Sequence, residues 1–109
     1  MIDFDKFLNA LAMTESNDDT KAWGDEGLAV GRFQMHPAFV WDYGPDTVGV
    51  VWSWDHVFRE TLRNFLAERE PIHNGDAVHI VMEFHLGVSA VSKGQWDKAY
   101  AERFARFYA

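Results

Sequence analysis

A carboxylate at the end of an apolar helix face is the first feature of the sequence that suggests chemistry. Phe4, Leu8, Leu11 and Glu15 follow one another at intervals of four, three and four residues, as on one face of an α-helix. Partial burial and the negative end of the helix dipole would both raise the pKa of a carboxyl group at this position. A carboxyl group that keeps its proton near neutral pH is suited to general acid catalysis. The alternative is that the helix ends at Met13, which would leave Glu15 as a solvated loop residue.

The elements that must position Glu15 are mostly helical. Apolar residues recur at helical spacing in five segments, which we predict as helices: residues 3–15, 37–43, 53–69, 75–86 and 97–108. The most apolar of them, 75–86, is predicted to be a central buried helix capped by Asn74 or Asp76. A strand is the alternative there, but a run of about 12 residues is long for a strand. The polar, glycine-rich residues 16–36 are predicted to form a long loop of the kind that often carries function.

The composition limits the classes of protein that the chain can represent. It has 109 residues, of which 48% are hydrophobic, a formal net charge of −7 and no cysteine. One packed domain is therefore expected over residues 1–109, without disulfides or thiolate chemistry. The negative charge disfavours binding to nucleic acid and to anionic membranes. The N-terminal stretch MIDFDKFLNA lacks the features of a signal peptide, and no apolar run is long enough for membrane insertion.

A second motif follows Glu15 in the predicted loop. The pair Glu15–Ser16 is followed by the stretch GRFQM, which begins at Gly31. This ordered pair resembles the lysozyme-like superfamily, and more narrowly the lytic transglycosylases and lambda-type phage lysozymes. In that family a helix ends in Glu-Ser or Glu-Gly, and a loop then carries Gly-Leu-Met-Gln or Gly-Arg-Tyr-Gln. The resemblance implies a mainly α, single lysozyme-like domain of about five helices, with Glu15 as catalytic acid and with Ser16, Gly31, Gln34 and Met35 at the glycan groove.

The resemblance continues through the rest of the chain with departures. The stretch EFHLG, residues 83–87, stands where the family has Ala-Tyr-Asn-x-Gly, so Phe84 keeps the aromatic ring without its hydroxyl and His85 replaces Asn. Tyr100 matches a tyrosine near the start of the closing helix. These matches imply that Phe84, His85 and Tyr100 line the wall of the groove opposite Gln34. A histidine satisfied in the core or facing solvent is the alternative for His85.

The implied reaction is cleavage of the β-1,4 bond between N-acetylmuramic acid and N-acetylglucosamine in peptidoglycan. Hydrolysis usually needs a second carboxylate; the candidates are Asp18, Asp19, Asp25 and Glu26, each of which can also be a solvated loop charge. A lytic transglycosylase needs none, because the sugar's 6-hydroxyl attacks and Glu15 serves as acid and then as base. The lack of a defined partner for Glu15 favours this lytic route. The alternatives are a hydrolytic muramidase, a catalytically silent glycan-binding or structural domain of the same fold, and a helical protein-interaction module.

Further expectations follow from the resemblance. It implies peptidoglycan glycan strands as the partner, a monomer, no cofactor, and a phage-encoded protein made in the cytoplasm that reaches the cell wall through a holin or within the virion. His73, His79 and His85 are spaced by six residues, so His79 and His85 do not share a helix face and no metal site is expected.

Four tryptophans are further candidates for contact with sugar rings. Trp23 and Trp41 are expected in or beside the groove. Trp52 and Trp54 can stack on sugars or pack in the core, and Trp54 shares the apolar face of its predicted helix.

Overall fold

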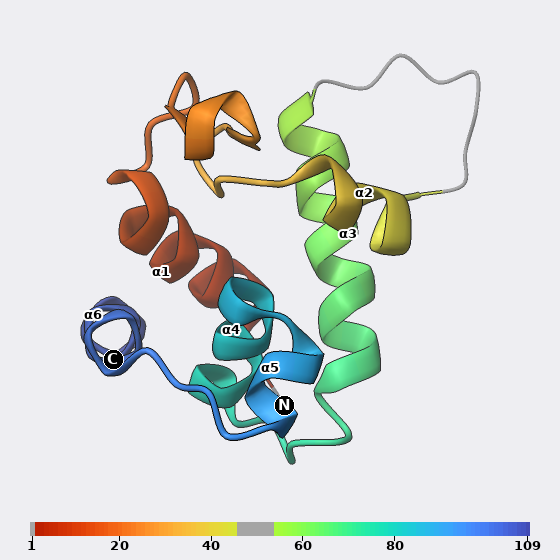
Figure 1. Ribbon diagram of the computed structural model, residues 1–109, viewed down its shortest axis with the longest axis vertical. Coiled ribbons are helices and arrows are strands. Elements are labelled where there is room, and N and C mark those ends of the chain that lie inside the picture. Colours follow the sequence, from red (N-terminus) through yellow and green to blue (C-terminus); the bar gives the residue numbers. More distant parts are fainter. Residues whose placement is uncertain (1, 46–53) are drawn as a thin grey trace.

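The computed structural model describes residues 2–45 and 54–109 and is mainly helical, as the sequence predicts (Figure 1). The helices are α1 (Phe4–Ser16), α2 (Pro37–Tyr43), α3 (Trp54–Arg69), α4 (Ala77–Leu86), α5 (Val88–Ser92) and α6 (Lys98–Tyr108). Between α1 and α2 lie strand β1 (Trp23–Gly24), the 3-10 helix η1 (Asp25–Gly27) and strand β2 (Ala29–Val30). Among the described residues, no helix has both the length and the apolar character needed to cross a membrane.

Helix α1 begins and ends with defined caps. The side chain of Asp3 accepts a hydrogen bond from the backbone N–H of Lys6 at 3.1 Å, which satisfies one of the free donors of the first turn. At the other end Asn17 adopts a left-handed conformation (φ 55°), and its N–H reaches the carbonyl groups of Ala12 and Met13. Glu15 therefore lies inside the helix, and the alternative that the helix ends at Met13 is wrong.

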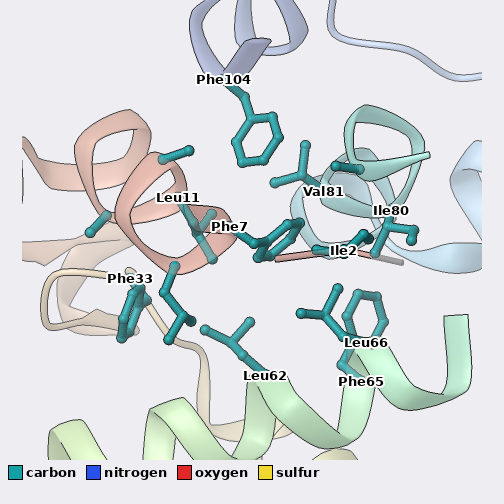
Figure 2. Packing of buried hydrophobic residues seen from close by; sticks show 14 of the residues in the cluster. Ile2, Phe7, Leu11, Phe33, Leu62, Phe65, Leu66, Ile80, Val81 and Phe104 are labelled. Atoms are coloured by element: carbon teal, nitrogen blue, oxygen red, sulfur yellow. The ribbon is translucent and has the colours of Figure 1, made fainter. Parts of the chain in front are cut away.

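A large apolar core holds α1, α3, α4 and α6 together (Figure 2). Phe7 of α1 packs edge-on against Phe104 of α6, with ring centroids 5.3 Å apart. Each such fully buried side chain contributes roughly 1.5–3 kcal/mol to stability. Phe33, from the loop after β2, is also fully buried in this core. That ring anchors the C-terminal part of the predicted 16–36 loop to the helices.

The segment predicted as a buried helix is α4. Asp76 caps it by accepting a hydrogen bond from the backbone N–H of His79 at 3.2 Å, so the strand alternative is wrong and Asp76, rather than Asn74, is the cap. Gly87 ends the helix with φ 95°, a conformation that favours glycine. Helix α5 follows at once and was not predicted, because five residues are too few to show a helical period.

The predicted loop contains a small antiparallel hairpin. Trp23 pairs with Val30 and Gly24 with Ala29, and an isolated bridge joins Val30 to Met35. Strands of two residues are too short for an alternating pattern, which explains why the sequence indicated only a loop. In Figure 1 this hairpin lies at one end of the molecule, beyond the C-terminal end of α1 and beside the start of α3.

Candidate functional site

Glu15 lies at the C-terminal end of α1 and is half-buried. The hydroxyl of Tyr100, from the first turn of α6, donates a hydrogen bond to Oε2 of Glu15. Within the described part of the chain, Oε1 of Glu15 has no such bond, so one carboxyl oxygen is fixed and the other remains available. Arg103 of α6 also donates to the carbonyl groups of Met13 and Thr14, at 3.1 and 3.2 Å, which holds α6 against this end of α1.

Burial raises the pKa of Glu15, and it is the largest influence on that group. The hydrogen bond from Tyr100 and the nearby His85 act in the opposite direction by favouring the carboxylate, while the negative charge of Asp25 raises the pKa further. Burial also raises the pKa of Tyr100, and the carboxyl of Glu15 adds to that effect, so the phenol stays protonated and remains a donor. The net result is a carboxyl group whose pKa lies above its ordinary value.

A second layer of contacts holds Tyr100. The ring of His85 stacks on the ring of Tyr100, with centroids 3.8 Å apart and an angle of 4° between the planes. Asp97 contacts both residues: Oδ2 lies 2.9 Å from Nε2 of His85, and Oδ1 accepts a hydrogen bond from the backbone N–H of Tyr100 at 3.0 Å. The backbone bond from Tyr100 lowers the pKa of Asp97, and the contact with His85 lowers it further. Asp97 therefore caps α6 and orients His85 at the same time.

Glu15 opens into a cleft of about 590 Å³, within the range of small-molecule sites. Gln34 lines it from the segment after β2, and Phe84 and His85 line it from the end of α4. Three of the predicted groove residues are therefore brought together with Glu15. The remaining lining residues come from the hairpin, α2 and the end of α4: Gly24, Asp25, Ala29, His36, Ala38, Phe39, Asp42, Leu86 and Gly87.

Gln34 is held in place by its own backbone and by a glycine. It adopts a left-handed conformation (φ 49°), and its Nε2 donates to the carbonyl of Gly31 at 2.8 Å. Its Oε1 occupies the space next to Gly24 that a β-carbon would fill. The absence of a side chain at Gly24 thus allows the amide of Gln34 to lie at the cleft.

Four other predicted groove residues do not line this cleft, and one of them is Tyr100, which contacts Glu15 instead. The hydroxyl of Ser16 donates to the carbonyl of Arg32 at 2.7 Å and accepts from the backbone N–H of Asp19 at 3.0 Å, so it fastens the loop to α1. Gly31 makes a tight turn (φ 79°) against the ring of Phe58. Met35 is only 1% exposed and packs in the core.

Of the four candidate second carboxylates, only Asp25 lines the cleft. Asp18 pairs with Arg32 at 3.3 Å, and Asp19 accepts a hydrogen bond from the backbone N–H of Lys21 at 2.9 Å. Glu26 is exposed and does not line the cleft. Asp25 does line it, and its Oδ2 lies 2.9 Å from Nε2 of His36, which lines it too.

The sequence did not single out His36, Asp42 or Asp97 as part of this site. Asp97 stands just before a helical run, where aspartate is a common N-cap, so its capping role could have been predicted from the sequence. Its contact with His85 depends on how α4 and α6 are placed, which the sequence pattern does not specify.

The two predicted tryptophans in the described chain do not line the cleft. Trp23 and Trp41 are 70% and 90% exposed and border a neighbouring apolar hollow together with Val40. Trp52 and the side chain of Trp54 lie outside the described residues.

Comparison with protein-family models, with curated proteins and with solved structures finds no match to this chain.

Proposed function

We propose that this protein cleaves peptidoglycan between N-acetylmuramic acid and N-acetylglucosamine, with Glu15 as the acid, in a domain of the lysozyme-like type. One observation carries the proposal: a half-buried carboxyl group of raised pKa opens into a cleft while Tyr100 fixes one of its oxygens. A proton held in this way is what protonation of a glycosidic oxygen requires. The amide of Gln34 and the rings of Phe84 and His85 supply the polar and flat surfaces on which a sugar can lie.

The reaction would begin with proton transfer from Oε1 of Glu15 to the glycosidic oxygen. The bond from that oxygen to the anomeric carbon breaks, and an oxocarbenium-like state develops on the muramic acid ring. In the lytic route the ring's own 6-hydroxyl attacks the anomeric carbon and returns its proton to Glu15. The products are a 1,6-anhydro-muramyl end and a free 4-hydroxyl, and Glu15 is protonated again.

Hydrolysis is the second candidate, and the position of Asp25 favours it. Asp25 is the only one of the four candidate carboxylates that lines the cleft with Glu15. A carboxylate there can activate a water molecule or attack the anomeric carbon itself. Its contact with His36 would keep it oriented. The product would then carry an ordinary reducing end.

The products of digestion distinguish these routes. Purified peptidoglycan is incubated with wild type and with Asp25→Asn, and the fragments are identified by mass spectrometry. Anhydro-muramyl ends formed by both proteins support the lytic route. Reducing ends formed by wild type, with a large loss of turnover in Asp25→Asn, support hydrolysis. If glycan binds but is not cleaved, the domain is a silent glycan-binding module; if glycan neither binds nor is cleaved, it is an interaction module.

The site of action follows from the proposed substrate. The protein would act as a monomer, without a cofactor, at the bacterial cell wall. A phage-encoded protein would reach the wall after holin release or as a virion component.

A further inference from the structure

A second cluster of titratable side chains lies outside the cleft, at the junction of α3 and α4. Its members are His73, in the turn between the two helices, and His79 and Glu83 of α4. One ligand atom from each lies within 4.8 Å of the others. His79 and Glu83 are four residues apart and share a helix face, and the ring of His73 stacks on that of His79 with centroids 4.1 Å apart. None of the three lines the cleft around Glu15.

His73 carries a polar atom that the described chain leaves unsatisfied. Its Nε2 is buried and forms no hydrogen bond with any described residue. It lies 3.0 Å from Oε1 of Glu83, close enough for an ion pair but without the direction of a hydrogen bond. Buried polar atoms are nearly always satisfied in native proteins, so an orphaned imidazole nitrogen beside a carboxylate suggests a missing ligand.

The carboxylate of Glu83 is held in a fixed position by Arg69. Its side chain is 3% exposed, and Arg69 donates to both of its oxygens, from Nε at 2.9 Å and from Nη2 at 2.7 Å. Each carboxylate oxygen keeps a lone pair after accepting from Arg69. Arg69 thus fixes the carboxylate as outer-shell partners do in metal sites, while its positive charge reduces the affinity for a cation.

We propose that His73, His79 and Glu83 bind one divalent transition-metal ion, of the Zn²⁺ class. Two imidazoles and one carboxylate are a common ligand set for such ions, whereas Ca²⁺ and Mg²⁺ prefer oxygen ligands alone. Small side-chain rotations would draw the three atoms to the spacing that bonds of about 2.0–2.2 Å require. The bound ion would join the turn after α3 to the middle of α4.

This set of three residues was not predicted from the sequence. The expectation from the sequence rested only on the three histidines, and the spacing of six places His79 and His85 on different faces of the helix. It did not include Glu83, and it could not show that the turn before α4 brings His73 against His79. The proposal is independent of the proposed glycan cleavage, because the metal would brace the fold at a different place.

Metal binding to the whole protein tests the proposal directly. The protein is freed of metal with a chelator and titrated with Zn²⁺ by calorimetry and with Co²⁺ by visible absorption, which reports tetrahedral coordination. The variants are His79→Gln and His73→Gln, and His56→Gln, which changes an exposed histidine of α3, is the control. Circular dichroism checks that each variant is folded.

We expect one ion per chain, an increase in melting temperature with Zn²⁺, and binding weakened by more than about tenfold in both cluster variants, since loss of even an outer-shell partner costs about 10–100-fold. The control should bind like wild type. Absence of binding by folded wild type would overturn the proposal. Equal binding by wild type and both cluster variants would overturn it too, because the ion would then lie elsewhere.

Discussion

Tyr100 donates its hydroxyl proton to Oε2 of Glu15 across a separation of 85 residues in the sequence. This bond joins the last helix to the end of the first, where Glu15 lines the cleft. It also opposes the effect of burial on the carboxyl, because a donor to the carboxylate favours the charged form. The pKa of Glu15 therefore depends both on its burial at the end of α1 and on the hydrogen bond from Tyr100 of α6.

Replacement of Tyr100 by phenylalanine should raise the pKa of Glu15 further. The ring remains to stack on His85, but the hydrogen bond that favours the carboxylate is lost. A carbon-13 NMR titration of the Glu15 carboxyl measures the change without relying on activity. If the protein cleaves glycan, the alkaline limb of its pH profile should move to higher pH as well.

Tyr43→Phe is the matched control, since Tyr43 donates in a similar way to Glu68, outside the cleft. It should leave the titration of Glu15 unchanged. An unchanged pKa in Tyr100→Phe would mean that the hydrogen bond does not govern the carboxyl.

The variant Glu15→Gln should be more stable than wild type at neutral and higher pH. The folded state raises the pKa of Glu15, so the stability associated with this group is fully present below its unfolded-state pKa and falls as the pH rises through the folded-state value. Glutamine cannot ionise and avoids that loss. Melting temperatures at about pH 8 should therefore favour the variant, and the difference should vanish near pH 4. A variant less stable than wild type at the higher pH would contradict the direction of the shift.

The two contacts of Asp97 can be separated by substitution. Asp97→Ser keeps a hydroxyl that can cap α6 but cannot reach the backbone and His85 together, whereas Asp97→Ala removes both contacts. We expect a clear fall in melting temperature for the alanine variant and a smaller one for the serine variant. Both should release the imidazole of His85, which proton NMR of the ring detects. A His85 signal that stays unchanged in both variants would show that Asp97 does not orient it.

Arg69→Met should be strongly destabilising, by about 3–5 kcal/mol, because it removes the bidentate partner of the buried carboxylate of Glu83. Urea unfolding measures the loss. The control is Lys98→Met, which removes an exposed pair with Glu102 at 3.9 Å and should cost at most about 1 kcal/mol. Similar losses of unfolding free energy in the two variants would mean that the buried ion pair stabilises the fold no more than the exposed one does.

The sequence predicted those parts of the structure that depend on local periodicity. The apolar spacing of α1 and the cap at Asp3 indicated both the helix and the side on which Glu15 lies. Contacts between elements that are distant in the sequence could not be predicted in this way. The stacking of His85 on Tyr100 and the convergence of His73 with Glu83 depend on how helices pack, and the hairpin's strands are too short to leave a pattern. Met35, which was expected at the groove, is buried in the core, and the bridge that joins its backbone to Val30 is not visible in the sequence.

The role of Glu15 is tested most directly by digesting purified peptidoglycan with wild type and with Glu15→Gln and measuring the fragments by mass spectrometry. We expect muropeptide fragments from wild type and a fall in their rate of release of at least about 10²-fold in the variant, the lower end of what general acid catalysis contributes. The variant should retain a folded circular dichroism spectrum and bind glycan. Equal release by the two proteins, or intact glycan from both, would contradict the assignment of Glu15 as the catalytic acid.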